Sequence, residues 1–254
     1  MCKKHYLPVT SVALLLTVSS VQSQATPFTN QTAFLAALPG AAGVLNFDSL
    51  SGGTILSGTT QTVTGGSGIG IQFPASVPNV LPPPATFDLM VVANTGGDNP
   101  TTSNPNSLGV NDPGNYNTIQ RGTVFSLGLT STVSAFGLSF ISPDALVNDD
   151  IELVAGSNMA SLAIVDRMSI VDGYYAYFLG IIDSTGFNSV KIQYGNTSPP
   201  GVAFLYNIDD LTVAAASTGI PTPGTLALLL GGVPALLLRR DRRVCAGRHL
   251  TLIP

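Results

Sequence analysis

Apolar residues recur at every second position in several short segments of this chain, and this alternation constrains the fold more than any other feature. Each such segment predicts a β-strand with one face toward a core, because successive side chains of a strand point to opposite sides. No helical segment separates these strands, which favours antiparallel pairing. The segments are residues 69–73, 125–129, 136–140, 151–155 and 190–194, the last with Val190, Ile192 and Tyr194 on its core face.

The pattern predicts an all-β fold, a two-sheet antiparallel sandwich of the jelly-roll kind that spans residues 26–213. Before it, Ala33, Phe34, Ala37 and Leu38 have helical spacing, and Pro39-Gly40 ends this short helix. Two stretches, the proline-rich residues 78–84 and the polar residues 93–106, read as surface loops.

Charge is distributed unevenly along the 254 residues. Residues 26–219 hold three basic residues against 13 acidic ones, a formal charge of −10. A body of this charge repels phosphate backbones, so we expect no nucleic-acid partner.

Cysteine and histidine occur only near the two ends, as Cys2, His5, Cys245 and His249. The body between them therefore has no thiol nucleophile, no Ser-His-Asp triad and no His-ligated metal. We expect a protein that is not an enzyme.

The N-terminus has the three parts of a secretory signal peptide, which we assign to residues 1–25. Lys3 and Lys4 supply the positive start, and residues 12–18 form the apolar centre. Ser23-Gln24-Ala25 then places small residues at the two positions that signal peptidase reads. The pattern predicts an N-terminal signal helix and export.

A second apolar run lies near the C-terminus and ends at four arginines, Arg239, Arg240, Arg242 and Arg243. Its leucines would cover every face of a helix, which is typical of a membrane anchor rather than an amphipathic core helix. Arginines that flank such a segment stay on the cytoplasmic side. We therefore expect an apolar anchor helix with its Arg cluster over residues 224–243, held in the inner membrane, and a cytoplasmic tail over residues 244–254.

Residues 214–223 form the linker, and the residues at its end carry a resemblance. The motif consists of Pro221, Thr222, Pro223, Gly224, Thr225 and Leu226. Followed by the apolar run and the arginines, it resembles the PEP-CTERM sorting signal of Gram-negative bacteria, with Thr222 where the family usually has Glu and Gly224 where Ala is commoner. The resemblance implies cleavage by an exosortase during export, and a setting of extracellular polysaccharide and biofilm at the cell surface.

Calcium is the cofactor that the acidic residues of the body favour, since it binds carboxylate and carbonyl oxygens. Asp209 and Asp210 lie on the last predicted strand, where Ile208 and Leu211 are out of phase, which indicates a β-bulge. The body is similar to β-sandwiches found with such tails, and calcium-bearing jelly rolls imply Asp48 as a partner. A second cluster is Asp144, Asn148, Asp149 and Asp150. The alternative for both clusters is solvated turn residues that cap backbone amides.

Three further patterns leave alternatives open. Tyr174, Tyr175, Tyr177 and the loop residue Tyr116 would suit carbohydrate binding or ordinary sheet packing. Asp149, Asp150 and Glu152 would suit a glycan hydrolase, which needs two facing carboxylates, with Asp150 and Glu152 on one strand face. Thr60, Thr62 and Thr64 form one rank of an ice-binding pattern, or a solvent-facing strand.

These observations together favour an exported, non-enzymatic protein of the envelope or extracellular matrix. The alternative is a calcium-dependent module that binds extracellular polysaccharide, and a glycan hydrolase is the third hypothesis.

Overall fold

The computed structural model describes residues 25–65, 68–79, 85–94, 101–103, 105–161, 168–169, 173–195 and 204–216. The predicted signal peptide, sorting motif, apolar anchor, Arg cluster and cytoplasmic tail lie outside the described residues. The chain divides into two units after Ala216, and every described residue belongs to the first. None of the helices in this described part is long and apolar enough to cross a membrane.

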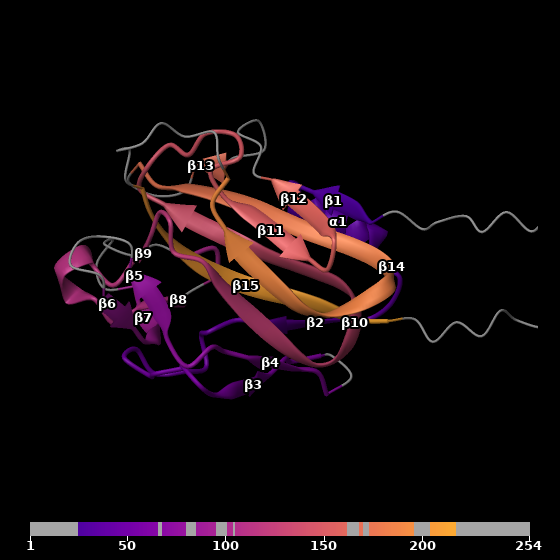
Figure 1. The fold of residues 1–254 in the computed structure, drawn as a ribbon, viewed down its shortest axis with the longest axis horizontal. Coiled ribbons are helices and arrows are strands. Elements are labelled where there is room, and N and C mark those ends of the chain that lie inside the picture. The colour runs from indigo at the N-terminus through magenta and orange to yellow at the C-terminus, as the bar shows by residue number, and fades with distance from the viewer. Residues whose placement is uncertain are drawn as a thin grey trace, which may run out of the picture. The chain divides into compact units, whose positions relative to one another are not determined.

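Strands are the main regular structure of the described chain, as the alternation predicts (Figure 1). One short helix, α1 (Gln31–Ala37), and one 3-10 turn, η1 (Pro113–Asn115), accompany them. The strands are β1 (Thr26–Phe28), β2 (Ala42–Leu45), β3 (Thr60–Thr62), β4 (Gly70–Gln72), β5 (Val77–Asn79), β6 (Ala85–Phe87), β7 (Leu89–Ala93), β8 (Asn106–Val110), β9 (Ile119–Gln120), β10 (Phe125–Ser142), β11 (Glu152–Ala155), β12 (Asn158–Ser161), β13 (Met168–Ser169), β14 (Tyr175–Gln193) and β15 (Leu205–Ala215).

A large antiparallel sheet of 13 strands forms the body, and β5 and β6 form a separate two-stranded sheet. The main path of the large sheet runs β12-β11-β14-β10-β15-β8-β7. Off this path, β1 and β13 pair with β14, β2 and β9 pair with β15, and β4 joins β10 to β3. The antiparallel class predicted from the sequence is therefore confirmed.

The predicted strands at residues 125–129 and 136–140 are two parts of one long strand, β10, which corrects the expectation of separate strands. The pairing of β10 with β14 shifts register between Gly128 and Val133 and again before Ala135. These shifts are bulges that bend the strand and do not end it.

Both parts of β10 contribute to the same hydrophobic core. Phe125 and Leu127 come from the part before the bulges, and Phe136, Leu138 and Phe140 from the part after them. The last three are fully buried. The bend at the bulges thus lets one strand line a shared interior along both of its parts.

The second part of β10 is buried on both faces, whereas the alternation predicts a half-buried strand there. Gly137 and Ser139 alternate with the core residues, but Ser139 is only 3% exposed. Phe34 of α1 packs over this second face, with its ring centroid 5.2 Å from that of Phe178. A Cβ built on Gly137 would lie 2.6 Å from Phe178 and 2.9 Å from Phe34, so the small residues of β10 make room for a second, aromatic core.

Two further expectations are corrected at the ends of strands. The alternation predicts Tyr194 on the core face, but this residue is 43% exposed, because β14 ends one residue earlier, at Gln193. Pro78, predicted to lie in a surface loop, belongs to β5 and pairs with Thr86 of β6. The expected helix at residues 33–38 and the strand around Ile71 are confirmed as α1 and β4.

The two ends of the described body lie in the same row of the sheet. Thr26 of β1 pairs with Ile182 of β14, Ile182 pairs with Ala135 of β10, and Ala135 pairs with Ala214 of β15. Adjacent strands lie about 4.8 Å apart, so three strand spacings place Thr26 about 14 Å from Ala214.

Candidate functional site

A β-bulge in β15 places two acidic residues side by side. Gly137 of β10 pairs with Thr212 of β15, but Ser139 pairs with Asp209, so three steps on β15 face two on β10. Asp210 has a left-handed backbone, with φ of 49°. Ile208 and Leu211 on either side are both fully buried in the main core. The bulge inferred from the spacing of these two residues is therefore confirmed.

Two residues of the loop between β7 and β8 donate hydrogen bonds to both carboxylates. The backbone N and Oγ1 of Thr102 each lie 2.9 Å from Asp209 Oδ2, and the backbone N of Ser103 lies 3.0 Å from the same atom. Thr102 Oγ1 and Ser103 Oγ also contact Asp210, at 2.8 and 3.0 Å from Oδ2 and Oδ1. The bulge and this loop thus hold the two carboxylates on the same side of the sheet.

Burial dominates the ionisation of Asp209. Asp209 has no exposed surface, and its desolvation raises its pKa to about 7, with the charge of Asp210 acting in the same direction. The hydrogen bonds from Ser103, Thr102 and the backbone of Asp210 oppose this rise in pKa. Asp209 therefore titrates near neutral pH.

A pocket of about 220 Å³ opens beside Asp210. Its polar lining comes from hydroxyl, amide and carboxylate side chains, and its apolar lining includes Ala176 and Phe178. The lining residues are Thr29, Asn30, Gln31, Thr32, Thr102, Ser139, Ala176, Tyr177, Phe178 and Asp210. Such a lining can exchange several hydrogen bonds with a polyhydroxylated molecule.

Asp48, the expected third calcium ligand, contacts a different group. Its Oδ1 accepts a hydrogen bond of 3.2 Å from the backbone N of Asn106, at the start of β8. Asn106 in turn donates through Nδ2 to the carbonyl oxygens of Phe47 and Leu50. Among the described residues, no group of three or more acidic, histidine or cysteine side chains could hold a metal ion. Calcium binding by Asp48, Asp209 and Asp210 stays a prediction.

Two residues of the second acidic cluster accept hydrogen bonds from backbone amides, as in the alternative that the sequence left open, but Asp150 is buried and not solvated. Asp144 Oδ2 accepts from the backbone N of Leu205 at 3.0 Å, and Asp150 Oδ2 accepts from that of Val147 at 2.7 Å. Burial raises the pKa of Asp150, and the positive charge of Arg121 opposes that rise. Asp149 has a left-handed backbone, with φ of 63°.

The predicted hydrolase pair is divided between two environments. Asp150 is 4% exposed and precedes β11, while Glu152 begins that strand and accepts a 2.8 Å bond from Gln193 Nε2. Glu152 and Gln193 line an open groove of about 340 Å³ together with Val124 and Tyr194. The two carboxyl groups therefore do not share the strand face that the sequence predicts.

The four tyrosines considered for carbohydrate binding differ in solvent exposure. Tyr177 is 3% exposed, and its hydroxyl accepts a 2.9 Å bond from the backbone N of Leu146, which favours packing over sugar binding. Tyr175 and Tyr174 are half-buried, and the ring of Tyr175 lies 6.5 Å from that of Tyr177. Tyr116 is 69% exposed.

The threonine rank faces solvent. Thr60, Thr62 and Thr64 are all exposed, as a solvent-facing strand requires.

The contacts of Thr102 and Ser103 with the acidic pair are absent from the sequence prediction. They lie in a polar stretch that reads as an ordinary loop, more than a hundred residues from Asp209. The high content of Thr and Ser in this loop is the sequence signal that could have indicated these contacts.

No protein-family model, curated protein or solved structure matches this chain.

Proposed function

We propose that this protein is exported and works, without catalysis, at the bacterial envelope or in the extracellular matrix. The observation that carries the proposal is the order of features near the C-terminus: a Pro-Thr-Pro motif at residues 221–223, an apolar run and then four arginines. This order resembles the PEP-CTERM signal, and the N-terminal signal peptide is the partner that such a tail needs. Signal peptidase, an exosortase-type enzyme and the inner membrane are the proposed processing partners.

The fold is compatible with attachment at one end. The described body begins next to Thr26 and ends next to Ala216, and both positions adjoin the row that joins Thr26 to Ala214. The body therefore begins at β1 and ends at β15, which lie three strand spacings apart in the same sheet. We further propose that the curved sheet forms the two layers of a jelly-roll-like sandwich, since both parts of β10 supply the same core.

Intact mass and cell fraction of the protein from its native host test the proposal. If the protein is sorted and released, its mass should correspond to a chain that begins near Ala25 and ends near Thr222. This chain should occur in the extracellular or surface fraction. Anchoring predicts an uncut C-terminus in the inner membrane. A chain that keeps residues 1–25 and remains in the cytoplasm contradicts export.

A matched pair of variants tests the motif itself. Replacing Pro221 and Pro223 with Ala should leave the C-terminus uncut if an exosortase-type enzyme reads this motif. Replacing Ser217 and Thr218 with Ala, in the same linker but outside the motif, should leave processing unchanged. Equal processing of both variants contradicts a sorting role for the two prolines.

The pocket beside Asp210 favours a second candidate, a calcium-dependent module that binds extracellular polysaccharide. Its hydroxyl and amide groups suit sugar hydroxyls, and Ala176 and Phe178 contribute to its apolar lining. Binding to a glycan array with and without a calcium chelator tests it, with Asp210→Asn as the variant and Asp88→Asn as the control. Binding that chelation and Asp210→Asn both abolish supports this candidate, while equal binding by all samples contradicts it.

A further inference from the structure

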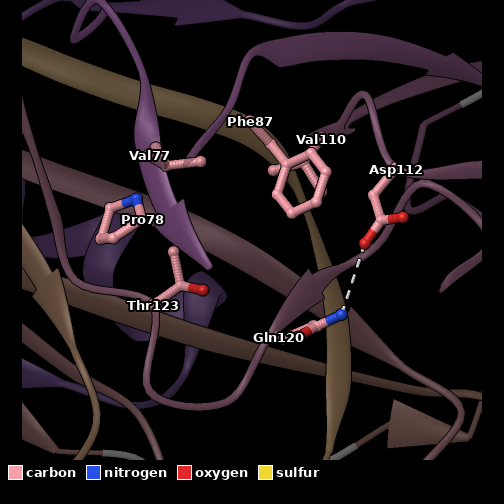
Figure 2. A pocket seen from close by; sticks show the side chains of 7 residues that line it. All are labelled: Val77, Pro78, Phe87, Val110, Asp112, Gln120 and Thr123. Carbon is pink, nitrogen blue, oxygen red and sulfur yellow. Dashed lines mark hydrogen bonds between the residues drawn. The ribbon is translucent and has the colours of Figure 1, made fainter. Parts of the chain in front are cut away.

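A small cavity lies where the β5–β6 hairpin meets the large sheet, away from the pocket beside Asp210 (Figure 2). Its volume is about 10 Å³, which is about the size of one water molecule. Val77, Pro78 and Phe87 reach it from the hairpin. The large sheet and its connections supply the remaining lining: Val110, Asp112, Gln120 and Thr123.

The polar side chains of this cavity are deeply buried. Asp112, Gln120 and Thr123 are 8%, 6% and 4% exposed. Asp112 Oδ2 accepts a 2.7 Å hydrogen bond from Asn115 Nδ2 and a 3.5 Å bond from Gln120 Nε2, the contact drawn in Figure 2. These bonds direct the amide nitrogen of Gln120 toward the carboxylate.

The carbonyl oxygen of the Gln120 amide differs from the nitrogen in its contacts. Among the described residues, no group donates a hydrogen bond to its buried Oε1. Exchanging the amide O and N would bring two acceptors together at Asp112 and would leave a buried donor in place of the acceptor. In either orientation, one polar atom of Gln120 needs a partner, and an unmet buried polar atom is costly.

We infer that this cavity binds one structural water, which donates a hydrogen bond to Gln120 Oε1 and bonds to Thr123 Oγ1. Water can serve as donor or acceptor, so it satisfies the amide in either orientation. A calcium ion is the poorer occupant, because it needs six to eight oxygen ligands and four of the seven lining residues are apolar. Both partners of the water belong to the large sheet and its connections, so the water satisfies the buried amide of Gln120 beside the apolar side chains of the hairpin.

A crystal structure of the full chain, at a resolution that orders individual waters, tests the inference. We expect one density peak about 2.6–3.2 Å from Gln120 Oε1. In Gln120→Leu, which removes the amide, the peak should disappear. In the control Gln72→Leu, an exposed glutamine of β4, the peak should persist.

Three results would overturn the inference: an empty cavity, a peak with the roughly 2.3–2.6 Å contacts of a calcium ion, or a peak that persists unchanged in Gln120→Leu. Soaking wild-type crystals in rubidium chloride separates water from a monovalent cation, since anomalous scattering at this position would identify a cation and reject water. If Gln120→Leu does not fold, the wild-type density and the rubidium soak still decide the question.

Discussion

Thr102 and Asp209 are joined by two hydrogen bonds, because the backbone N and Oγ1 of Thr102 both lie 2.9 Å from the same carboxylate oxygen. This contact ties the loop between β7 and β8 to the central strand β15. Its acceptor is a fully buried acid whose pKa is raised to about 7. The protonation of Asp209 therefore couples the stability of the fold to pH.

Stability should fall as the pH rises from about 4 to about 7. Asp209 has a pKa of about 7 in the folded chain against an ordinary value of 3.8, so the folded state binds more protons than the unfolded state in this window. Asp209 alone contributes a slope of at most ~1.4 kcal/mol per pH unit, and Asp150, whose pKa burial also raises, adds to it in the same direction. Urea unfolding at a series of pH values measures it.

Asp209→Asn should flatten this dependence, because it removes the titrating group while keeping the side-chain shape. Asp88→Asn, a half-buried residue outside the bulge, should leave it in place. An unchanged slope in Asp209→Asn would show that other groups cause the pH dependence.

Gly180→Ala should destabilise the protein by about 1–3 kcal/mol, the usual effect of overpacking. A Cβ at this position would lie 2.6 Å from Phe34 and 2.9 Å from Phe178. Gly40→Ala is the control, because no atom lies within 4 Å of the corresponding Cβ. Thermal unfolding compares the two, and equal melting temperatures would contradict close packing of α1 on β14.

Tyr177→Phe should cost about 1–3 kcal/mol, because it leaves the buried backbone N of Leu146 without its acceptor. Tyr116→Phe removes the same hydroxyl from a side chain that is 69% exposed, and its effect should be close to zero. Chemical denaturation measures both variants. If Tyr177→Phe loses no more unfolding free energy than Tyr116→Phe does, the result would contradict a structural role for the Tyr177 hydroxyl.

Asn30→Ala should destabilise the protein by about 1 kcal/mol, since Asn30 Oδ1 caps α1 by accepting a 2.9 Å bond from the backbone N of Ala33. Asn30→Asp keeps the acceptor and should restore most of the loss. Urea midpoints give the comparison. If Asp and Ala behave alike at this position, the cap contributes little.

Local periodicity was enough to predict the fold class and the bulge. The bulge follows from Ile208 and Leu211, which are three residues apart and yet both enter the core, an arrangement that a regular strand forbids. The helix at Phe34 follows likewise from its spacing and from the Pro-Gly that ends it. These features depend on residues close together in the sequence.

The remaining features depend on contacts between distant segments. Gly137 resembles a solvent-facing position, and only the packing of Phe34, about a hundred residues earlier, shows that it is covered. Thr102 and Asp209 are likewise too far apart for any local pattern to join them. The end of β14 before Tyr194 depends on pairing, which the alternation of apolar residues does not encode.

The position of β15 has a mechanical consequence. This strand is held by β10 on one side and by β2, β8 and β9 on the other, and the chain leaves it at Ala215. A pull applied at Ala215 along the strand axis would load the ladder bonds in shear, all together, and would not open them one by one. A body tethered through β15 would therefore resist traction better than one tethered through an edge strand.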